Sequence, residues 1–264
     1  MSKFLVDLKH MMNRIKKTIQ KNNKNLVGYF MAGEFPKEIT LQMMHKSVEA
    51  GMNMIELGFP FSDPTADGQT IQLSAKVSLE NGTKIQDVLH IVHEFRRKNI
   101  DTPIILMGYY NIIFSFGDEA FVKECSLNGV DGLIIVDLPI EESSTIHKLA
   151  EAHNIDIIQI VSFLTDKARF DEIQNKAKGF MYLISSFGVT GQTTPMTEKI
   201  QSYIKQMQPS IPMFVGFGIS SPQIAREVSQ HCSGVVVGSH FIQQMHAGGI
   251  TQLVKSVHEI KNAL

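Results

Sequence analysis

The sequence contains no tryptophan and only two cysteines among its 264 residues. Cys125 and Cys232 are far apart, form no CxxC pair and follow no secretory signal. We therefore expect buried, reduced thiols in a cytoplasmic protein rather than a disulfide-stabilised secreted one. The sequence also lacks an apolar run long enough to cross a bilayer, so no membrane-spanning helix is predicted.

Positive charge is not concentrated in any part of the chain. The formal net charge is −1, and lysine and arginine form no stripe. Because nucleic-acid binding depends on such a basic surface, we expect a small-molecule partner instead.

The residues that are present indicate a globular protein with a large core. Hydrophobic residues make up 43% of the sequence and charged residues 19%. The length is close to the roughly 250 residues of a single closed α/β barrel. We predict one domain over residues 1–264.

Short apolar, β-branched runs alternate with stretches of helical periodicity, which is typical of parallel βαβ units. Parallel strands that are buried on both faces have this nearly continuous apolar character. The predicted strands are Leu26–Gly33, Met52–Gly58, Thr102–Tyr109, Asp131–Leu138, Ile155–Ser162, Gly179–Ser185, Ile211–Gly218 and Gly234–Gly238.

Helices are predicted between these strands, and no linker divides them. A doubly wound open sheet is the alternative, but the turn after the first strand, MAGEFP (31–36), lacks its glycine fingerprint. The sequence therefore predicts an α/β fold of the (β/α)8 TIM barrel class. The predicted helices are Glu38–Ala50, Ile85–Lys98, Glu119–Leu127, Glu142–His153, Asp166–Lys176, Thr197–Met207, Pro222–Gln230 and Thr251–Lys261.

The N-terminal segment, residues 1–21, predicts an extra amphipathic helix. Apolar residues from Phe4 to Ile19 share one face, and most of the lysines lie elsewhere. A helix lying on a membrane surface is the alternative, but nothing else in the chain indicates a membrane. We expect this helix to cover the bottom of the barrel.

Three of the predicted strands end in glycine-rich loops: SSFGVTG (185–191), VGFGIS (215–220) and VVVGSHF (235–241). Barrels of this class hold phosphate with backbone N–H groups of their last loops and with a short extra helix, here beginning near Ser239. No arginine falls within the three loops, so backbone dipoles would have to bind the phosphate. The alternative for each loop alone is a tight turn.

The second predicted strand contains Glu56 within an otherwise apolar run and continues to Asp67. A buried carboxyl group is costly unless it is paired or used, so Glu56 is a candidate general acid and base with a raised pKa. A salt-bridged structural role is the alternative. For Asp67 the alternative is an N-cap of a helical turn beginning at Gly68.

Residues missing from the strand ends narrow the chemistry. No lysine lies at a predicted strand end, which argues against a Schiff-base aldolase. No cluster with metal-ligand spacing occurs there, and His90 and His93 are expected on a solvated helix face. Acid–base chemistry on a phosphorylated, aromatic substrate remains, because aromatic residues also fall near strand ends: Tyr29, Phe59, Phe61, Tyr109 and Tyr182.

Together these segments resemble the tryptophan synthase alpha subunit family, from about Leu26 to the C-terminus. The resemblance lies in IELGFPFSDPTADG (55–68), in GVTG after the sixth strand, in GFGIS after the seventh and in GS after the eighth. It implies a lyase that cleaves indole-3-glycerol phosphate to indole and glyceraldehyde 3-phosphate in tryptophan biosynthesis. It also implies that Glu56 and Asp67 are the catalytic carboxylates.

The resemblance further implies the binding residues and partners. Tyr29, Ile71, Met107, Tyr109 and Tyr182 would bind the substrate. The chain itself would hold no cofactor and no metal, because pyridoxal phosphate belongs to a beta subunit with which family members form an α2β2 heterotetramer. The implied phosphate-binding residues are Gly191, Gly218, Gly238 and Ser239.

Four positions depart from the family pattern: Gly28, Glu34, Phe163 and His240. We expect the first two to affect the access loop or a partner contact, and His240 to add charge near the phosphate. The alternatives left open are a stand-alone indole-releasing lyase, a phosphate barrel with another substrate, and a catalytically weak allosteric subunit. Residues 59–67 and 187–195 are candidate loops for closing over substrate.

Overall fold

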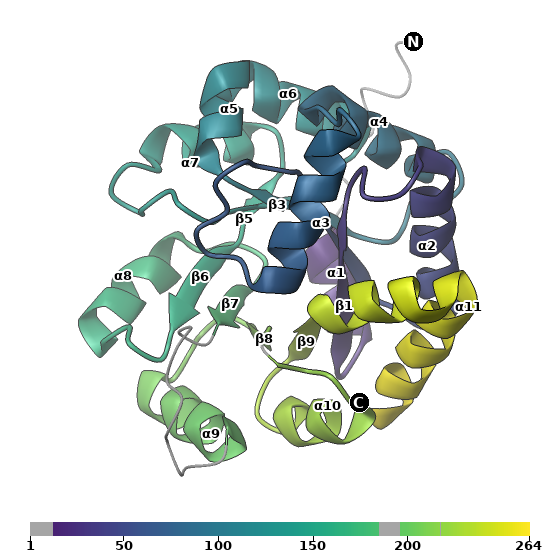
Figure 1. The fold of residues 1–264 in the computed structure, drawn as a ribbon. Helices are drawn as coiled ribbons and strands as arrows, with labels where there is room; N and C mark the ends of the chain where they lie inside the picture. Colours follow the sequence, from purple (N-terminus) through teal and green to yellow (C-terminus); the bar gives the residue numbers. More distant parts are fainter. Residues whose placement is uncertain (1–12, 185–195, 217) are drawn as a thin grey trace.

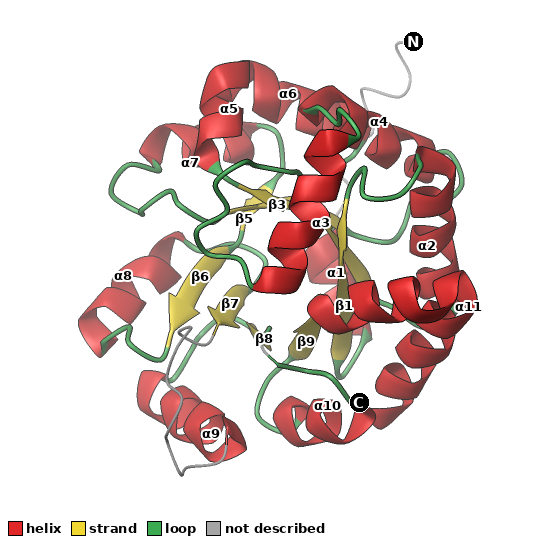
Figure 2. Ribbon diagram, in the orientation of Figure 1, coloured by secondary structure: helices red, strands yellow, loops and turns green. Residues whose placement is uncertain are grey.

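The computed structural model describes residues 13–184, 196–216 and 218–264. A central barrel of strands is surrounded by helices (Figures 1 and 2). Within the described residues, nine parallel strand segments form one sheet in the order β5-β4-β3-β2-β1-β9-β8-β7-β6. They are β1 (Asn25–Met31), β2 (Met54–Gly58), β3 (Ile104–Gly108), β4 (Gly132–Ile135), β5 (Asp156–Ile157), β6 (Gln159–Ser162), β7 (Met181–Ile184), β8 (Met213–Val215) and β9 (Gly234–Val237).

One predicted strand closes the barrel. The run Ile155–Ser162 forms two segments, β5 and β6, on either side of Ile158. β5 pairs with β4, whereas β6 pairs with β7, so the two ends of the sheet meet in this single stretch of chain. The structure thereby confirms the predicted (β/α)8 barrel.

The helices surround the barrel in the predicted places, with two additions. Helices α3 and α5 were not predicted, because exposed apolar residues such as Leu73 and Val77 obscure the periodicity of α3 and because α5 is only seven residues long. The helices are α1 (Arg14–Lys21), α2 (Lys37–Glu49), α3 (Gln69–Glu80), α4 (Ile85–Arg96), α5 (Tyr110–Phe116), α6 (Asp118–Asn128), α7 (Ser144–Ala152), α8 (Lys167–Lys176), α9 (Met196–Met207), α10 (Pro222–Ser229) and α11 (Ser239–Ala263).

Helix α11 combines two predicted helices. Its backbone departs from helical geometry at Gly248 and Gly249, and the latter has a φ of 63°. The first part is the short helix expected near Ser239, and the second part contains the predicted helix Thr251–Lys261. Glycine permits this left-handed break at little steric cost.

Two apolar layers lie on the two faces of the strands. Side chains of alternate strand residues, among them Val27, Met54, Ile105 and Phe214, pack together inside the barrel. Their neighbours in sequence, such as Leu26 and Ile55, belong to the layer beneath the helices. Because the interior is filled with side chains, an active site can form only at an end of the barrel.

Helix α1 lies at the N-terminal end of the strands. Ile15 is fully buried there, 3.1 Å from the position that a Cβ of Gly132 would occupy. Arg14 and Arg96 both pair with the buried Asp131 just before β4, at 2.8 and 2.6 Å. This is the position expected for a helix that covers the bottom of the barrel, although residues 1–12 of the predicted helix lie outside the described part. In the described part, no helix has the length and apolar character to span a membrane.

Candidate active site

Glu56 occupies the middle of β2, in register with Tyr29 of β1 and Ile105 of β3. Alternation along the strand places it on the same face as Met54, which points into the barrel. The residue is 1% exposed, and neither carboxyl oxygen has a hydrogen-bond partner among the described residues. The structural alternative of a salt-bridged or hydrogen-bonded glutamate is therefore not supported.

Burial and a neighbouring charge set the protonation of Glu56. Desolvation, and to a smaller extent the negative charge of Asp67, raises the pKa of Glu56 to about 8. Glu56 therefore carries its proton at neutral pH, as a general acid must.

Asp67 lies in the loop between β2 and α3 and is held by Tyr109 at the end of β3. The Tyr109 hydroxyl donates to Asp67 Oδ2 at 3.0 Å, and the Tyr109 hydroxyl oxygen in turn accepts the Ala66 N–H at 3.0 Å. The N-cap of α3 is Gly68, with no side-chain cap bond, so the helix-capping alternative for Asp67 is wrong.

The pKa of Asp67 is raised less than that of Glu56. Burial raises it to about 6, and the hydrogen bond from Tyr109 acts in the opposite direction. At neutral pH the Asp67 carboxylate is ionised while Glu56 is protonated. When the pKa values of two carboxyl groups differ in this way, the ionised group can act as a base or stabilise a positive charge, and the protonated group can act as an acid.

Tyr29 and Tyr182 complete the apolar surroundings of the two carboxyl groups. A Cβ on Gly58 would overlap the hydroxyl of Tyr29, and one on Gly216 would overlap the hydroxyl of Tyr182. Burial raises the pKa of both tyrosines well above the usual value, so both remain neutral. Sequence reasoning missed Gly58 and Gly216, although glycine at a strand end was the available signal.

Met107 and Ile71 lie beside these groups, as predicted for substrate-binding residues. Met107 lines a cavity of about 10 Å³ together with Tyr29, Asp67 and Tyr109. Ile71 packs against a small apolar cluster that includes Tyr29. The structure thus brings all five predicted substrate-binding residues to the end of the barrel where Glu56 and Asp67 lie.

The N-terminus of α11 adjoins this group. Its N-cap is Gly238, which makes no side-chain cap bond, and Ser239 is its first residue. A Cβ on Gly238 would lie 3.4 Å from Tyr29 Cβ and 3.7 Å from Ile71 Cδ1. Free N–H groups at a helix N-terminus attract anions, so a phosphate could bind within reach of the carboxyl groups.

Of the two other predicted phosphate-binding glycines, Gly218 lies within the described residues and Gly191 does not. Gly218 has a φ of 59°, and a Cβ there would meet no atom within 4 Å. Gly191 and the predicted closing loop 187–195 lie outside the described residues. The phosphate assignment therefore rests on Gly218, Gly238 and Ser239.

We expect Gly218→Ala to weaken binding of glycerol 3-phosphate by roughly tenfold or more, because the added methyl group obstructs backbone N–H donors to a charged ligand. Gly82→Ala is the matched control, since Gly82 also has a positive φ, 75°, and open space around it. Both variants should lose similar stability, but only Gly218→Ala should lose affinity in calorimetric titration. Equal affinities in wild type, Gly218→Ala and Gly238→Val would remove the phosphate site.

His240 does not behave as expected from its place after Ser239. Its Nε2 lies 2.7 Å from Ser256 Oγ in the second part of α11. Burial lowers the pKa of His240, so the ring is neutral at pH 7. The predicted extra charge beside the phosphate is therefore not supported.

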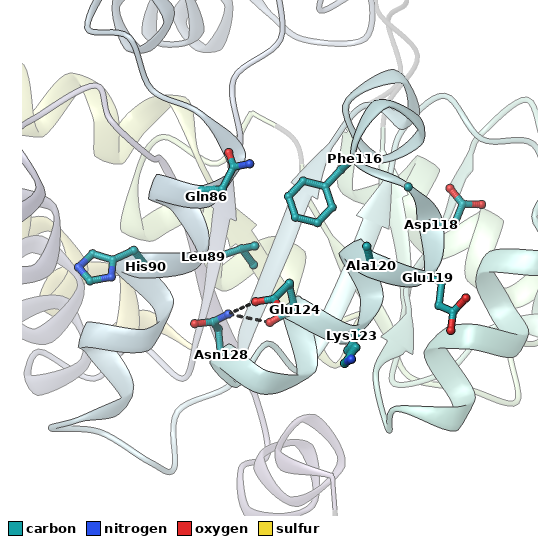
Figure 3. A pocket seen from close by; sticks show the side chains of 11 residues that line it. Gln86, Leu89, His90, Phe116, Asp118, Glu119, Ala120, Lys123, Glu124 and Asn128 are labelled. Carbon is teal, nitrogen blue, oxygen red and sulfur yellow. Dashed lines mark hydrogen bonds between the residues drawn. The ribbon is translucent and has the colours of Figure 1, made fainter.

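A larger cavity lies elsewhere on the molecule, along helices α4 and α6, with a volume of about 900 Å³ (Figure 3). Leu89, Phe116, Glu124 and Asn128 are among its lining residues, and none of the predicted site residues is. Within the described ranges, no group of three or more His, Cys, Asp or Glu side chains is arranged to hold a metal ion.

Comparisons with known proteins show which proteins this chain resembles. The family model described as tryptophan synthase alpha chain matches residues 15–263. The tryptophan synthase alpha chain of Acinetobacter baumannii is 38% identical over 257 residues, covering 95% of this chain and 96% of its own length.

Solved structures give the same result. The crystal structure of the tryptophan synthase alpha chain from Legionella pneumophila has a TM-score of 0.88 and 32% identity, covering 96% of this chain and 97% of its own. A structure of tryptophan synthase from Mycobacterium tuberculosis has a TM-score of 0.86 and 26% identity, covering 96% and 98% respectively.

Proposed function

The chain belongs to the tryptophan synthase alpha chain family, and on that basis we propose that Glu56 and Asp67 are the groups with which it cleaves indole-3-glycerol phosphate. The reaction releases indole and glyceraldehyde 3-phosphate in tryptophan biosynthesis, which makes the chain a carbon–carbon lyase. The enzyme family needs no cofactor in this subunit, since pyridoxal phosphate belongs to the beta subunit.

The observation that carries the residue assignment is the pair of carboxyl groups with separated pKa values at the barrel end. Glu56 begins protonated, with its pKa raised to about 8, and gives its proton to indole C3. This protonation breaks the aromaticity of the five-membered ring and leaves positive charge at the ring nitrogen. The Glu56 carboxylate, now ionised, is the base for the next step.

Asp67 stabilises that positive charge. Its ionised carboxylate accepts a hydrogen bond from the ring N–H, while Tyr109 fixes one of its oxygens. Because Glu56 is buried and Asp67 is only partly exposed, the attraction between carboxylate and cation would be stronger than in solution.

Cleavage follows when Glu56 removes the proton of the hydroxyl adjacent to C3. The electron pair of the O–H bond forms the aldehyde C=O, and the C–C bond breaks as its electron pair restores the indole ring. Glu56 ends protonated as it began, so the cycle needs no outside proton. The N-terminus of α11 would hold the phosphate of the substrate throughout.

Indole release from indole-3-glycerol phosphate by the purified chain tests the activity directly. A stand-alone lyase would turn over at full rate without a partner. A catalytically weak allosteric subunit would bind glycerol 3-phosphate but release no indole under any condition. A barrel acting on another substrate would fail both to bind and to cleave indole-3-glycerol phosphate.

We propose that the chain assembles with a beta subunit into an α2β2 heterotetramer, as its family does. On mixing with that subunit, the two should sediment as one species and the lyase rate should rise, because assembly favours the closed site. Glu56→Gln should sediment in the same way without a rise in rate, which separates assembly from catalysis. Two separate species with an unchanged rate would instead favour a stand-alone enzyme.

We propose that the protein acts in the cytoplasm as one domain over residues 1–264. Both cysteines, Cys125 and Cys232, are free and buried, which suits a reducing compartment.

A further inference from the structure

Glu34 joins three elements at the catalytic end of the barrel. It lies in the turn after β1, and its side chain is 3% exposed. Its Oε1 accepts a hydrogen bond from Ser74 Oγ of α3 at 2.8 Å and lies 2.7 Å from His246 Nε2 of α11. The imidazole tautomer that carries hydrogen on Nε2 can donate to this oxygen.

The two partners of Glu34 lie on the helices that carry the two halves of the site. Helix α3 begins just after Asp67, and Ser74 is in its second turn. Helix α11 begins at Ser239, and His246 lies at the end of its first part, before the break at Gly248. Glu34 therefore connects two helices through polar contacts: α3, which follows Asp67, and α11, whose N-terminus is the proposed phosphate site.

Other contacts strengthen the attachment of α3 to the loop that contains Glu34. Ser78 donates to the carbonyl oxygen of Ala32 at 2.5 Å, and Asn81 donates to that of Gly33 at 2.9 Å. The attachment of α11 depends on fewer polar groups: the His246 ring packs on Phe35 at 5.2 Å between centroids. Of the two arms, the α11 arm is consequently the easier to release.

Glu34 also lies near Tyr29, one of the residues predicted to bind the substrate. Tyr29 packs with Ile242 of α11 and Ala75 of α3 in one apolar cluster. Burial is the largest cause of the raised pKa of Tyr29, and the negative charge of Glu34 is one of the smaller causes. A shift of either helix relative to Glu34 would therefore displace Tyr29 and the side chains packed against it.

We propose that Glu34 is a positioning residue, which through His246 holds the phosphate-binding helix, and through Ser74 holds the helix that follows Asp67, at the separation the substrate requires. This inference rests on the proposed roles of Asp67 and the α11 N-terminus. It gives a use to a residue that departs from the family pattern, and it predicts that the two arms affect different kinetic constants.

The α11 arm is tested with His246→Ala, measured as the full chain in the indole-release assay. We expect KM for indole-3-glycerol phosphate to rise about threefold to tenfold, the range expected for losing a partly exposed hydrogen bond to a carboxyl group, with kcat changed less than about twofold. His246→Gln keeps an N–H donor at similar reach and should restore KM. His258→Ala, an exposed histidine in the second part of α11, is the matched control.

The α3 arm is tested with Ser74→Ala, which should lower kcat more than it raises KM, because it loosens the helix behind Asp67. The double variant Ser74→Ala/His246→Ala should resemble Glu34→Ala, since all three remove the same connection. Glycerol 3-phosphate titration should show weaker binding for His246→Ala and unchanged binding for Ser74→Ala.

Two results would overturn the proposal. One is a loss of melting temperature in His246→Ala and Ser74→Ala with unchanged kcat and KM, which indicates a merely structural link. The other is failure of His246→Gln to restore KM, which indicates that ring packing on Phe35 matters instead. Loss of turnover in Glu56→Gln is independent of both, so the proposed function can stand when the Glu34 proposal fails.

Discussion

Glu56→Gln should leave a folded, substrate-binding barrel whose turnover falls by at least the roughly 10²–10⁴-fold that general acid–base catalysis contributes. Glutamine has the size of glutamate and cannot transfer the proton, and in the proposed mechanism Glu56 handles two protons in succession. Steady-state indole release and substrate titration on the same preparation measure the two properties. Glu49→Gln, on the exposed face of α2, is the matched control for removal of one carboxylate.

The pH dependence of the melting temperature of Glu56→Gln is a second test, because it reports on the raised pKa of Glu56. With a folded-state pKa of about 8 against a usual value of 4.5, folded wild type binds more protons than unfolded chain between these pH values. Its stability therefore falls as pH rises through that window, whereas the amide has no such dependence. We expect the difference in melting temperature, variant minus wild type, to increase as the pH rises from 5 to 8. Normal turnover, or a joint loss of binding and stability, would refute the catalytic role.

Asp67→Asn should lower kcat by about 10²–10³-fold, because an amide cannot supply the negative charge that stabilises the cationic intermediate. Protonation by Glu56 remains possible, so the loss should be smaller than in Glu56→Gln if that residue serves in both steps. Asp63→Asn, an exposed carboxylate of the same loop, is the control and should retain activity when the chain is assayed alone.

The pH profile tests the Asp67 assignment independently. In wild type, kcat/KM should rise as Asp67 ionises near pH 6 and fall as Glu56 loses its proton near pH 8. Asp67→Asn should lose the acid limb and keep the alkaline one. An unaltered bell-shaped profile in the variant would show that another group controls the acid limb.

The sequence alone was sufficient to predict the barrel, because that information is local and repeats along the chain. Each apolar run between helical stretches predicts a buried parallel strand, and eight such units leave few ways to form a sheet. The candidate site could also be predicted, since Glu56 interrupts an apolar strand and glycine gathers at the last strand ends. The family resemblance then gave these residues their chemistry.

Other features depended on contacts between segments distant in sequence. The split of the predicted strand Ile155–Ser162 follows from its pairing with different neighbours at its two ends. Helix α3 forms although its periodicity is weak, because Ser74, Ser78 and Asn81 attach it to the loop after β1. Neither pairing partners nor cross-chain hydrogen bonds are encoded in local periodicity.

The protonation states were likewise decided by the tertiary structure. The sequence placed Glu56 and Asp67 eleven positions apart. Only the fold buries Glu56 without a hydrogen-bond partner among the described residues, while Tyr109, just after β3, donates to Asp67. The link from Glu34 to His246, 212 positions apart, has no signal in the sequence at all. Sequence thus determined which chemical groups are available, whereas desolvation and long-range contacts determined which of them carry a proton and which hold the others in place.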